Sequence, residues 1–445
     1  MAKLLAYDDI SRQNQTRDCC MSGGDSAAGL QGRCETSFKV KRCGLSSNPV
    51  SETSEHKPIR VSGKGVIAFR LSRHHLSKGA SSDSFASVAG DMAGAQAQVL
   101  LAAQISIWAR LGGARLRDLD SAIWKDHTLV KAWCMRRTMF LVPSHELAVY
   151  VRGTVRRAAY NFRWALSRIG SRQELDKLLD NVLEVLSQPR TRTELAQTLS
   201  KSHGYKLKSK AGGGWGNRRA VPWIKVGGAS LPVGFLLHVI AARDVICSGP
   251  NRGNESTFVR ADRWIPDWKD MPSVEAEREL LVKYLRAFGP ATLADFALWA
   301  GMYVRDAKEI WSREAENIAQ VDIEGLKAGI LRSDLPELEK AEVDQPVVRL
   351  LPFFDSFVLG HKSHRNIVDE KNQRKIYRPQ GWVSPVLLVD GRAQGVWSHT
   401  QQGSNLEVRV TPFQSLSSRV TSQLREEALN LGRFLECPGV KTIIA

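Results

Sequence analysis

The stretch Gly94–Arg110, GAQAQVLLAAQISIWAR, joins a glycine-led turn that carries two glutamines to an apolar segment of helical length. The segment Val99–Leu111 is apolar on nearly every side, as expected of a helix buried in a core. Gln96 and Gln98 are harder to explain as packing, because a buried amide needs partners for its donors and acceptors. Two amides at the start of a helix in a basic protein indicate a site. The alternative is that they cap the turn or bind backbone groups.

The overall composition points to a polyanionic partner. The chain has 445 residues, a formal charge of +17 and a hydrophobic share of 43%, which permits a sizeable core. A basic excess of this size favours nucleic acid, since no basic amphipathic helix of the membrane-surface kind stands out. The alternative is that the charge only aids solubility. The length predicts roughly two to four compact units.

No apolar run is long enough to cross a bilayer, and Asp8 and Asp9 stand where a signal peptide needs apolar residues. We therefore expect a cytoplasmic, nucleoid-associated protein without a membrane partner. The seven cysteines form no C-x-x-C pair, which favours reduced thiols over a zinc module. His361 and His364 lack an evident third ligand. We predict no metal and no cofactor.

Residues 1–65 are rich in Ser, Gly, Asn and charges and are predicted to be a disordered tail. Residues 66–165 are predicted to form a first winged helix-turn-helix unit that holds the Gln-x-Gln motif. Its expected elements are helices over Phe85–Met92, Val99–Leu111 and Leu119–Trp124, followed by a strand or hairpin arm over Val130–Val142. Ser144 is expected to cap a further helix.

The same outline recurs twice, in predicted units at 166–270 and 271–345. Thr191 and Thr292 are expected to cap helices, and Gly301 to end the second of these. The other expected elements are helices over Leu175–Leu186, Pro232–Ile246, Ala276–Phe288 and Val304–Ile318, and a strand at Ser256–Val259.

Residues 346–445 change in character and are predicted to be β-rich with a closing helix over Ser415–Phe434. Alternating strands and the hairpin signal Asp390–Gly391 carry this prediction. Asp355 ends the first of these strands, where it is expected to cap a turn or to hold a cation such as Arg365. The predicted fold class is α+β and helix-rich, with tandem winged helix-turn-helix units and a β-rich C-terminal part.

Two basic patches are predicted to contact DNA, with the alternative that each is a solvated surface. The first surrounds a glycine-rich segment and reads as a basic wing or insert: Lys206, Lys208, Lys210, Arg218 and Arg219. The second is a basic loop or hairpin suited to a groove: His361, Lys362, His364 and Arg365. Arg136 and Arg137, in the first strand ribbon, are added to the predicted DNA-binding residues. Phosphate contacts by such side chains would make binding strongly salt-dependent.

Several stretches together resemble one family, the winged-helix DNA glycosylases of the AlkZ and YcaQ kind. The resemblance covers about residue 66 to the end and rests on the order of its motifs: Gly94–Gln98 with Trp108–Arg110, Trp133–Thr138 with Leu141–Pro143, Ser256–Val259, Gly289–Phe296, Leu350–Asp355 with Leu359–Gly360, and Trp382–Gly391. The tail has no counterpart in this resemblance.

The resemblance implies winged-helix units around a basic concave surface and removal of N7-alkylated purines or unhooking of interstrand crosslinks. It assigns catalysis to a Q-x-Q or Q-x-D motif, which Gln96 and Gln98 match in the first form. This chain departs from the family at three points. Arg137 replaces a usual Gly, Phe140 replaces a common His, and 206–228 looks like an insertion. These departures bear on the substrate more than on the fold.

The resulting hypothesis is a monofunctional DNA glycosylase, because no lysine adjoins the two amides to form a Schiff base. An N7-alkylated guanine is cationic and leaves without a general acid, so amides that hold a water can suffice. Its partner would be damaged double-stranded DNA, bound by a monomer. The alternative is a non-catalytic winged-helix DNA-binding protein or transcriptional regulator. A structural or RNA-binding module is a third reading. Gln104 is predicted to be a bystander.

Overall fold

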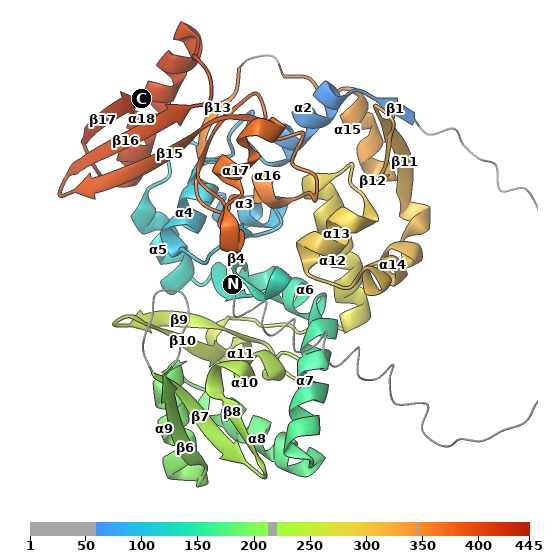
Figure 1. Cartoon of the computed structure of the whole chain (residues 1–445), viewed down its shortest axis with the longest axis vertical. Coiled ribbons are helices and arrows are strands. Elements are labelled where there is room, and N and C mark those ends of the chain that lie inside the picture. Colours follow the sequence, from blue (N-terminus) through green and yellow to red (C-terminus); the bar gives the residue numbers. More distant parts are fainter. Residues whose placement is uncertain (1–58, 212–219, 344–345) are drawn as a thin grey trace, which may run out of the picture. The chain divides into compact units, whose positions relative to one another are not determined.

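The computed structural model describes residues 59–211, 220–343 and 346–445, drawn as a coloured ribbon in Figure 1. Helices alternate with small sheets, so the chain has the predicted α+β class. Residues 59–445 form one compact unit. Order begins earlier than predicted, because β1 (Ile59–Val61) pairs in parallel with β11 and α2 (Gly63–Arg73) starts at a Ser62 cap. The rest of the predicted tail, residues 1–58, lies outside the described residues.

The Gln-x-Gln stretch belongs to a first group of helices and strands. The group contains α3 (Phe85–Asp91), β2 (Ala95–Gln96), α4 (Leu100–Trp108), α5 (Leu116–Trp124), β3 (Leu129–Trp133) and β4 (Met139–Pro143). Helix, short strand, two helices and a two-stranded ribbon is the order of a winged helix. Gly94, with φ +89°, makes the turn from α3 into β2, where a Cβ would lie 3.1 Å from the side chains of Phe140 and Val142.

The same order recurs in two further groups. The second contains α8 (Arg172–Val185), β5 (Arg190–Thr191), α9 (Arg192–His203), α10 (Val233–Ile240), β9 (Ile246–Arg252) and β10 (Glu255–Arg260). The third contains α12 (Ser273–Phe288), a bridge from Ala291 to Gly329, α13 (Leu293–Ala300), α14 (Val304–Arg313), β11 (Ile318–Ile323) and β12 (Leu326–Leu331). Thr191 and Thr292 cap α9 and α13 through complete capping boxes, and Gly301 ends α13, as predicted.

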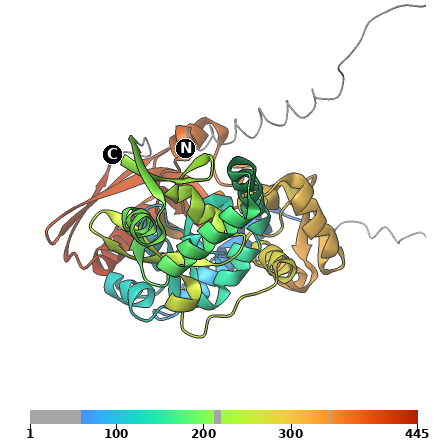
Figure 2. The same cartoon turned by 90° about the horizontal axis from the view of Figure 1, so that it is seen from below.

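The ribbons of the first two groups join in a six-stranded sheet of order β2-β4-β3-β9-β10-β5, with the β3–β9 contact at Lys131 and Ser248. Between α9 and α10 the chain adds a separate sheet of β6 (Lys206–Ala211), β7 (Ala220–Val226) and β8 (Ala229–Pro232). The groups are linked by α6 (Leu147–Arg152), α7 (Val155–Ile169) and α11 (Ala261–Trp264). Helices α7 and α10 pack side by side, as both views show (Figures 1 and 2).

The C-terminal part is a five-stranded sheet covered by α18 (Ser418–Phe434), as Figure 1 shows. Its strands are β13 (Val348–Leu351), β14 (Val386–Val389), β15 (Arg392–Gln402), β16 (Asn405–Pro412) and β17 (Gly439–Ile444). The connections include α15 (Leu335–Glu339), α16 (Ser356–Leu359) and α17 (Gln373–Ile376). Buried side chains of the first group and of this part belong to one apolar core, so the two are not packed independently.

Several predicted helix boundaries were wrong, and α4 ends at Trp108 rather than at Leu111. Ser144 begins a short 3₁₀ turn, and α6 starts only at Leu147 without a side-chain cap from it. Helix α10 ends at Ile240, and the apolar residues from Ile246 form strand β9 instead. Helix α14 ends at Arg313, since Ile318 begins β11. In the last two cases an apolar run continued from a helix into a strand, which periodicity alone cannot separate.

Candidate active site

Gln96 lies at the edge of the six-stranded sheet. It is the last residue of β2, pairs with Phe140 of β4, and is 7% exposed. Its side-chain oxygen Oε1 accepts a hydrogen bond of 2.8 Å from Nη2 of Arg136. The buried amide of Gln96 therefore has a charged hydrogen-bond donor as its partner.

Arg136 occupies the turn between β3 and β4 and has a left-handed backbone conformation, with φ 53°. Its other terminal nitrogen, Nη1, donates to the carbonyl oxygen of Trp299 at 2.7 Å, and its guanidinium carbon lies 5.4 Å from the ring centre of Phe140. Burial lowers the pKa of Arg136 to about 10, so the guanidinium keeps its charge at neutral pH. A fixed positive charge thus stands beside Gln96.

Gln98 has a different environment, because it follows β2 and its side chain is exposed. Its Oε1 accepts a long bond of 3.4 Å from the backbone nitrogen of Met139. Within the described ranges, its amide nitrogen has no hydrogen-bond partner. One amide of the motif is therefore buried and held by Arg136, while the other faces solvent with donors to spare.

The C-terminal part contacts the turn that precedes Gln96 and the helix that follows Gln98. Ser356 donates a bond of 2.6 Å to the carbonyl oxygen of Gly94, in the turn that leads into β2. Asp355 accepts bonds of 2.8 and 2.9 Å from Arg110, just after α4, and both side chains are fully buried. Asp355 also caps α16 by accepting from the backbone nitrogen of Phe357. It thus fills both predicted roles, with Arg110 rather than Arg365 as the cation.

Comparing the chain with the model of one protein family decides which family it belongs to. Residues 89–434 match the family described as DNA glycosylase AlkZ-like.

The chain belongs to the AlkZ-like DNA glycosylase family.

A curated relative, the interstrand DNA cross-link repair glycosylase of Streptomyces sahachiroi, is 28% identical over 384 residues. The alignment covers 84% of this chain and 97% of the relative. The solved structure of the Streptomyces sahachiroi DNA glycosylase AlkZ matches with a TM-score of 0.69 and 25% identity, over 86% of this chain and 100% of that one. The AlkZ-like chain is therefore a DNA glycosylase that acts on DNA. These matches favour the enzyme over the predicted alternative of a regulator.

Of the predicted DNA-binding residues in this AlkZ-like chain, Arg136 lies in the site itself. Arg137 follows it in the same turn, also with positive φ, and lines a small cavity with Arg157 and His238. Lys206 and Lys208 lie two residues apart on β6 and are exposed. Lys210 also belongs to β6, but its side chain lies outside the described part. Arg218 and Arg219 lie wholly outside the described residues.

The second predicted patch is only partly available to DNA. The ring of His361 contacts the carbonyl oxygen of Phe288 at 2.9 Å, and burial, with Arg70 nearby, lowers the pKa of His361 to about 3. His364 stacks on Tyr377, and burial lowers its pKa as well. A lowered pKa disfavours the cationic form of both rings, so these two histidines suit packing better than phosphate binding. Lys362 and Arg365 are exposed.

Sequence reasoning missed an aromatic and basic cluster beside the small cavity. Tyr160 of α7 packs against Tyr303 at the start of α14, with the two rings 5.4 Å apart and edge to face, and the guanidinium of Arg163 lies over the ring of Tyr160. Arg305 donates to the hydroxyl of Tyr160, and Arg157 to that of Tyr303. The spacing of these residues along α7 was a usable signal, because side chains three and four apart share a helix face.

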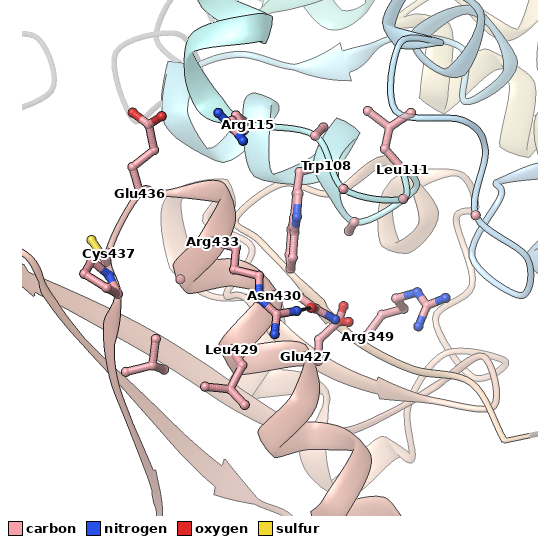
Figure 3. Close-up of a pocket in the computed structure, with 18 residues that line it drawn as sticks. Trp108, Leu111, Arg115, Arg349, Glu427, Leu429, Asn430, Arg433, Glu436 and Cys437 are labelled. Carbon is pink, nitrogen blue, oxygen red and sulfur yellow. Dashed lines mark hydrogen bonds between the residues drawn. The ribbon is translucent and has the colours of Figure 1, made fainter.

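A larger cavity, of about 960 Å³, opens at the opposite end of α4 from Gln98. Figure 3 shows Trp108, Glu427 and Arg433 around it, with Asn430 bonded to Arg433. Burial raises the pKa of Glu427 to about 7. No group of three His, Cys, Asp or Glu side chains that could hold a metal occurs in the described part of the chain. Nor does any helix there have the length and apolarity to cross a membrane.

Proposed function

We propose that this AlkZ-like glycosylase is monofunctional and removes N7-alkylated purines or unhooks crosslinks formed through them, with Gln96 and Gln98 as the catalytic pair. One observation carries the proposal: two neighbouring amides, one bonded to a guanidinium and one exposed. In the described ranges neither amide is hydrogen-bonded to a carboxylate or a lysine. Water is then the nucleophile that such a site can use.

The chemistry fits a leaving group that is already activated. An N7-alkylated purine is cationic, departs as a neutral base and leaves an oxocarbenium-like sugar for water to attack. The exposed Gln98 can hold that water and direct it at the sugar. Gln96 can donate its N–H₂ group toward the same site, since its oxygen faces Arg136. Neutral amides are weak bases, so a neutral base with a strong glycosidic bond is a poor substrate.

The DNA-binding surface that we propose includes the exposed face of β6 and β7. Lys206 lies directly opposite Lys225 across the two strands, and Lys208 opposite Trp223. Residues opposite each other share a face, and like charges there repel, so an anion laid across them would relieve the repulsion. Arg137, Lys210, Arg218, Arg219, Lys362 and Arg365 remain in the proposed surface. We also propose that the protein acts as a monomer, in the cytoplasm and on nucleoid DNA.

The test is base release from duplex DNA that carries N7-methylguanine or a bulkier N7 adduct. We expect wild type to release the base faster than spontaneous depurination, and Gln96→Ala and Gln98→Ala to lose about 100-fold or more of that rate. Gln104→Ala is the matched control, because Gln104 is a buried amide on α4 that bonds Asp120 at 2.7 Å, outside the site. No release by wild type on either substrate overturns the activity, and equal rates in all variants overturn the site.

A further inference from the structure

The turn that carries Arg136 rests directly on the third helical group. Gly301, which ends α13 with φ +74°, lies so close that a Cβ on it would stand 2.7 Å from Cα and 2.8 Å from N of Arg136. Real Cβ atoms do not approach backbone atoms this closely. The contact joins residues that are 165 positions apart in the sequence, and it needs glycine both for the left-handed backbone and for the space.

The guanidinium of Arg136 spans two acceptors from different groups. One is Oε1 of Gln96, at 2.8 Å, and the other is the carbonyl oxygen of Trp299, at 2.7 Å. Trp299 lies in the last turn of α13, where carbonyl groups lack helical partners and the helix end favours a cation. The end of α13 thus contacts the backbone of Arg136 and supplies an acceptor for its side chain, and the two contacts together orient Arg136.

From this geometry we infer that Arg136 is a positioning residue for Gln96, held in place by Gly301 and Trp299 of the third helical group. The inference deepens the proposed function and rests on it. Sequence reasoning had placed Arg136 among the DNA contacts. In the structure both terminal nitrogens of its guanidinium are already bonded to protein acceptors.

Arg136 fixes which way the Gln96 amide points. A guanidinium has donors and no acceptor, so the atom that faces it must be the amide oxygen. The N–H₂ group of Gln96 must then point away from Arg136. A charge-assisted bond of this kind is stronger than a neutral one and holds the amide in one of its two flips. Without it, the amide can rotate, and misplaced catalytic groups commonly cost about 100-fold in rate.

A double-mutant cycle tests whether Arg136 acts through Gln96. The single-turnover rate of N7-methylguanine release is measured at saturating DNA for wild type, Arg136→Met, Gln96→Ala and the double variant. We expect Arg136→Met to lose about 10- to 100-fold in a wild-type background and less than about 2-fold in the Gln96→Ala background. Arg136→Lys keeps the charge but cannot hold two acceptors in one plane, so it should restore part of the rate.

DNA affinity separates positioning from phosphate contact. If Arg136 only positions Gln96, Arg136→Met leaves the dissociation constant and its salt dependence unchanged within about 2-fold. A phosphate contact would instead weaken binding and reduce the salt slope by about 1. That result, or independent losses in the cycle, would overturn the inference while leaving the glycosylase activity established by the wild-type rate.

Gly301→Ala tests the contact between the end of α13 and the backbone of Arg136, and Gly170→Ala is its matched control. Gly170 ends α7 with φ +79°, and a Cβ on it meets nothing within 4 Å. Both substitutions impose the same backbone strain, but only Gly301→Ala drives into Arg136. We expect Gly301→Ala to lose more thermal stability than Gly170→Ala, because of the clash with Arg136, and to be the only one of the two with a lower base-release rate. Equal base-release rates in the two variants would contradict the inference that Gly301 holds Arg136 in place.

Amide hydrogen exchange gives a readout that does not depend on activity. We expect the segment 94–98 to exchange faster in Arg136→Met and Gly301→Ala than in wild type or Gly170→Ala. If wild type releases no base, the proposed function fails, and this measurement alone decides whether Arg136 orders the segment. Unchanged exchange in both site variants overturns the inference.

Discussion

Arg110 and Asp355 form a fully buried ion pair with two hydrogen bonds of 2.8 and 2.9 Å, across 245 positions of sequence. Ser106 donates a further bond of 2.5 Å to the same carboxylate. The ion pair links the end of α4 to the start of α16. Ser356, the residue after Asp355, hydrogen-bonds the turn that precedes Gln96. The C-terminal part is therefore a structural support for the motif in the first group.

Breaking this pair should destabilise the whole unit. Asp355→Ala leaves the Arg110 guanidinium buried without its counter-ion, which typically costs about 3–5 kcal/mol. Chemical denaturation of the full chain measures the change in the free energy of unfolding. The matched control is Glu407→Ala, which removes the partly exposed pair of Glu407 with Arg409 and should cost less than about 1 kcal/mol. Similar costs for the two variants would show that the buried pair does not join the two parts.

The paired lysines of the β6–β7 sheet give a prediction about salt. If Lys206 and Lys208 each meet one phosphate, the double substitution to Gln should reduce the magnitude of the salt slope of DNA binding by about 2. Titrations of an undamaged duplex at several salt concentrations measure the slope. Lys441→Gln is the control, since Lys441 is an exposed lysine of β17 in the C-terminal sheet. A slope that stays constant in the double variant would remove this face from the DNA surface.

Glu427 should make stability depend on pH. Burial raises the pKa of its carboxyl from 4.5 to about 7, so the folded state resists an ionisation that the unfolded chain allows. The cost is absent below pH 4.5, grows up to about pH 7 and is constant above it. Glu427→Gln should therefore increase the free energy of unfolding at pH 8 by about 3 kcal/mol, seen as a higher melting temperature, and leave the melting temperature nearly unchanged at pH 4.5.

The control for this prediction is Glu426→Gln, an exposed neighbour on the same helix. It should shift the melting temperature little at either pH. If Glu427→Gln changes stability equally at pH 4.5 and pH 8, the effect comes from packing and not from the charge.

Local signals in the sequence predicted much of the fold. The capping residues Thr191 and Thr292 and the stop at Gly301 act through neighbours three or four positions away, and these predictions were confirmed. The apolar stretch after Gln98 was likewise recognised as a buried helix. The strand β17 was missed, because its short segment follows α18 closely and owes its state to pairing with β16.

The site was harder to predict, because its partners are distant in sequence. Nothing near Arg136 indicates that Trp299 and Gly301 fix its side chain and backbone. Its charge alone suggested a DNA contact, as did that of the loop containing His361, whose ring turns inward to Phe288. Charge can be read from residue types, whereas burial and hydrogen-bond partners depend on packing between groups that sequence patterns do not locate.

We propose that two neutral amides suffice because the base to be removed is cationic. The most direct test compares single-turnover base release from two otherwise identical duplexes, one with N7-methylguanine and one with uracil. We expect wild type to accelerate loss of N7-methylguanine above the spontaneous rate, Gln98→Ala to lose about 100-fold or more of that rate, and uracil to stay in place. Release of uracil at a comparable rate, or no acceleration with N7-methylguanine, would contradict it.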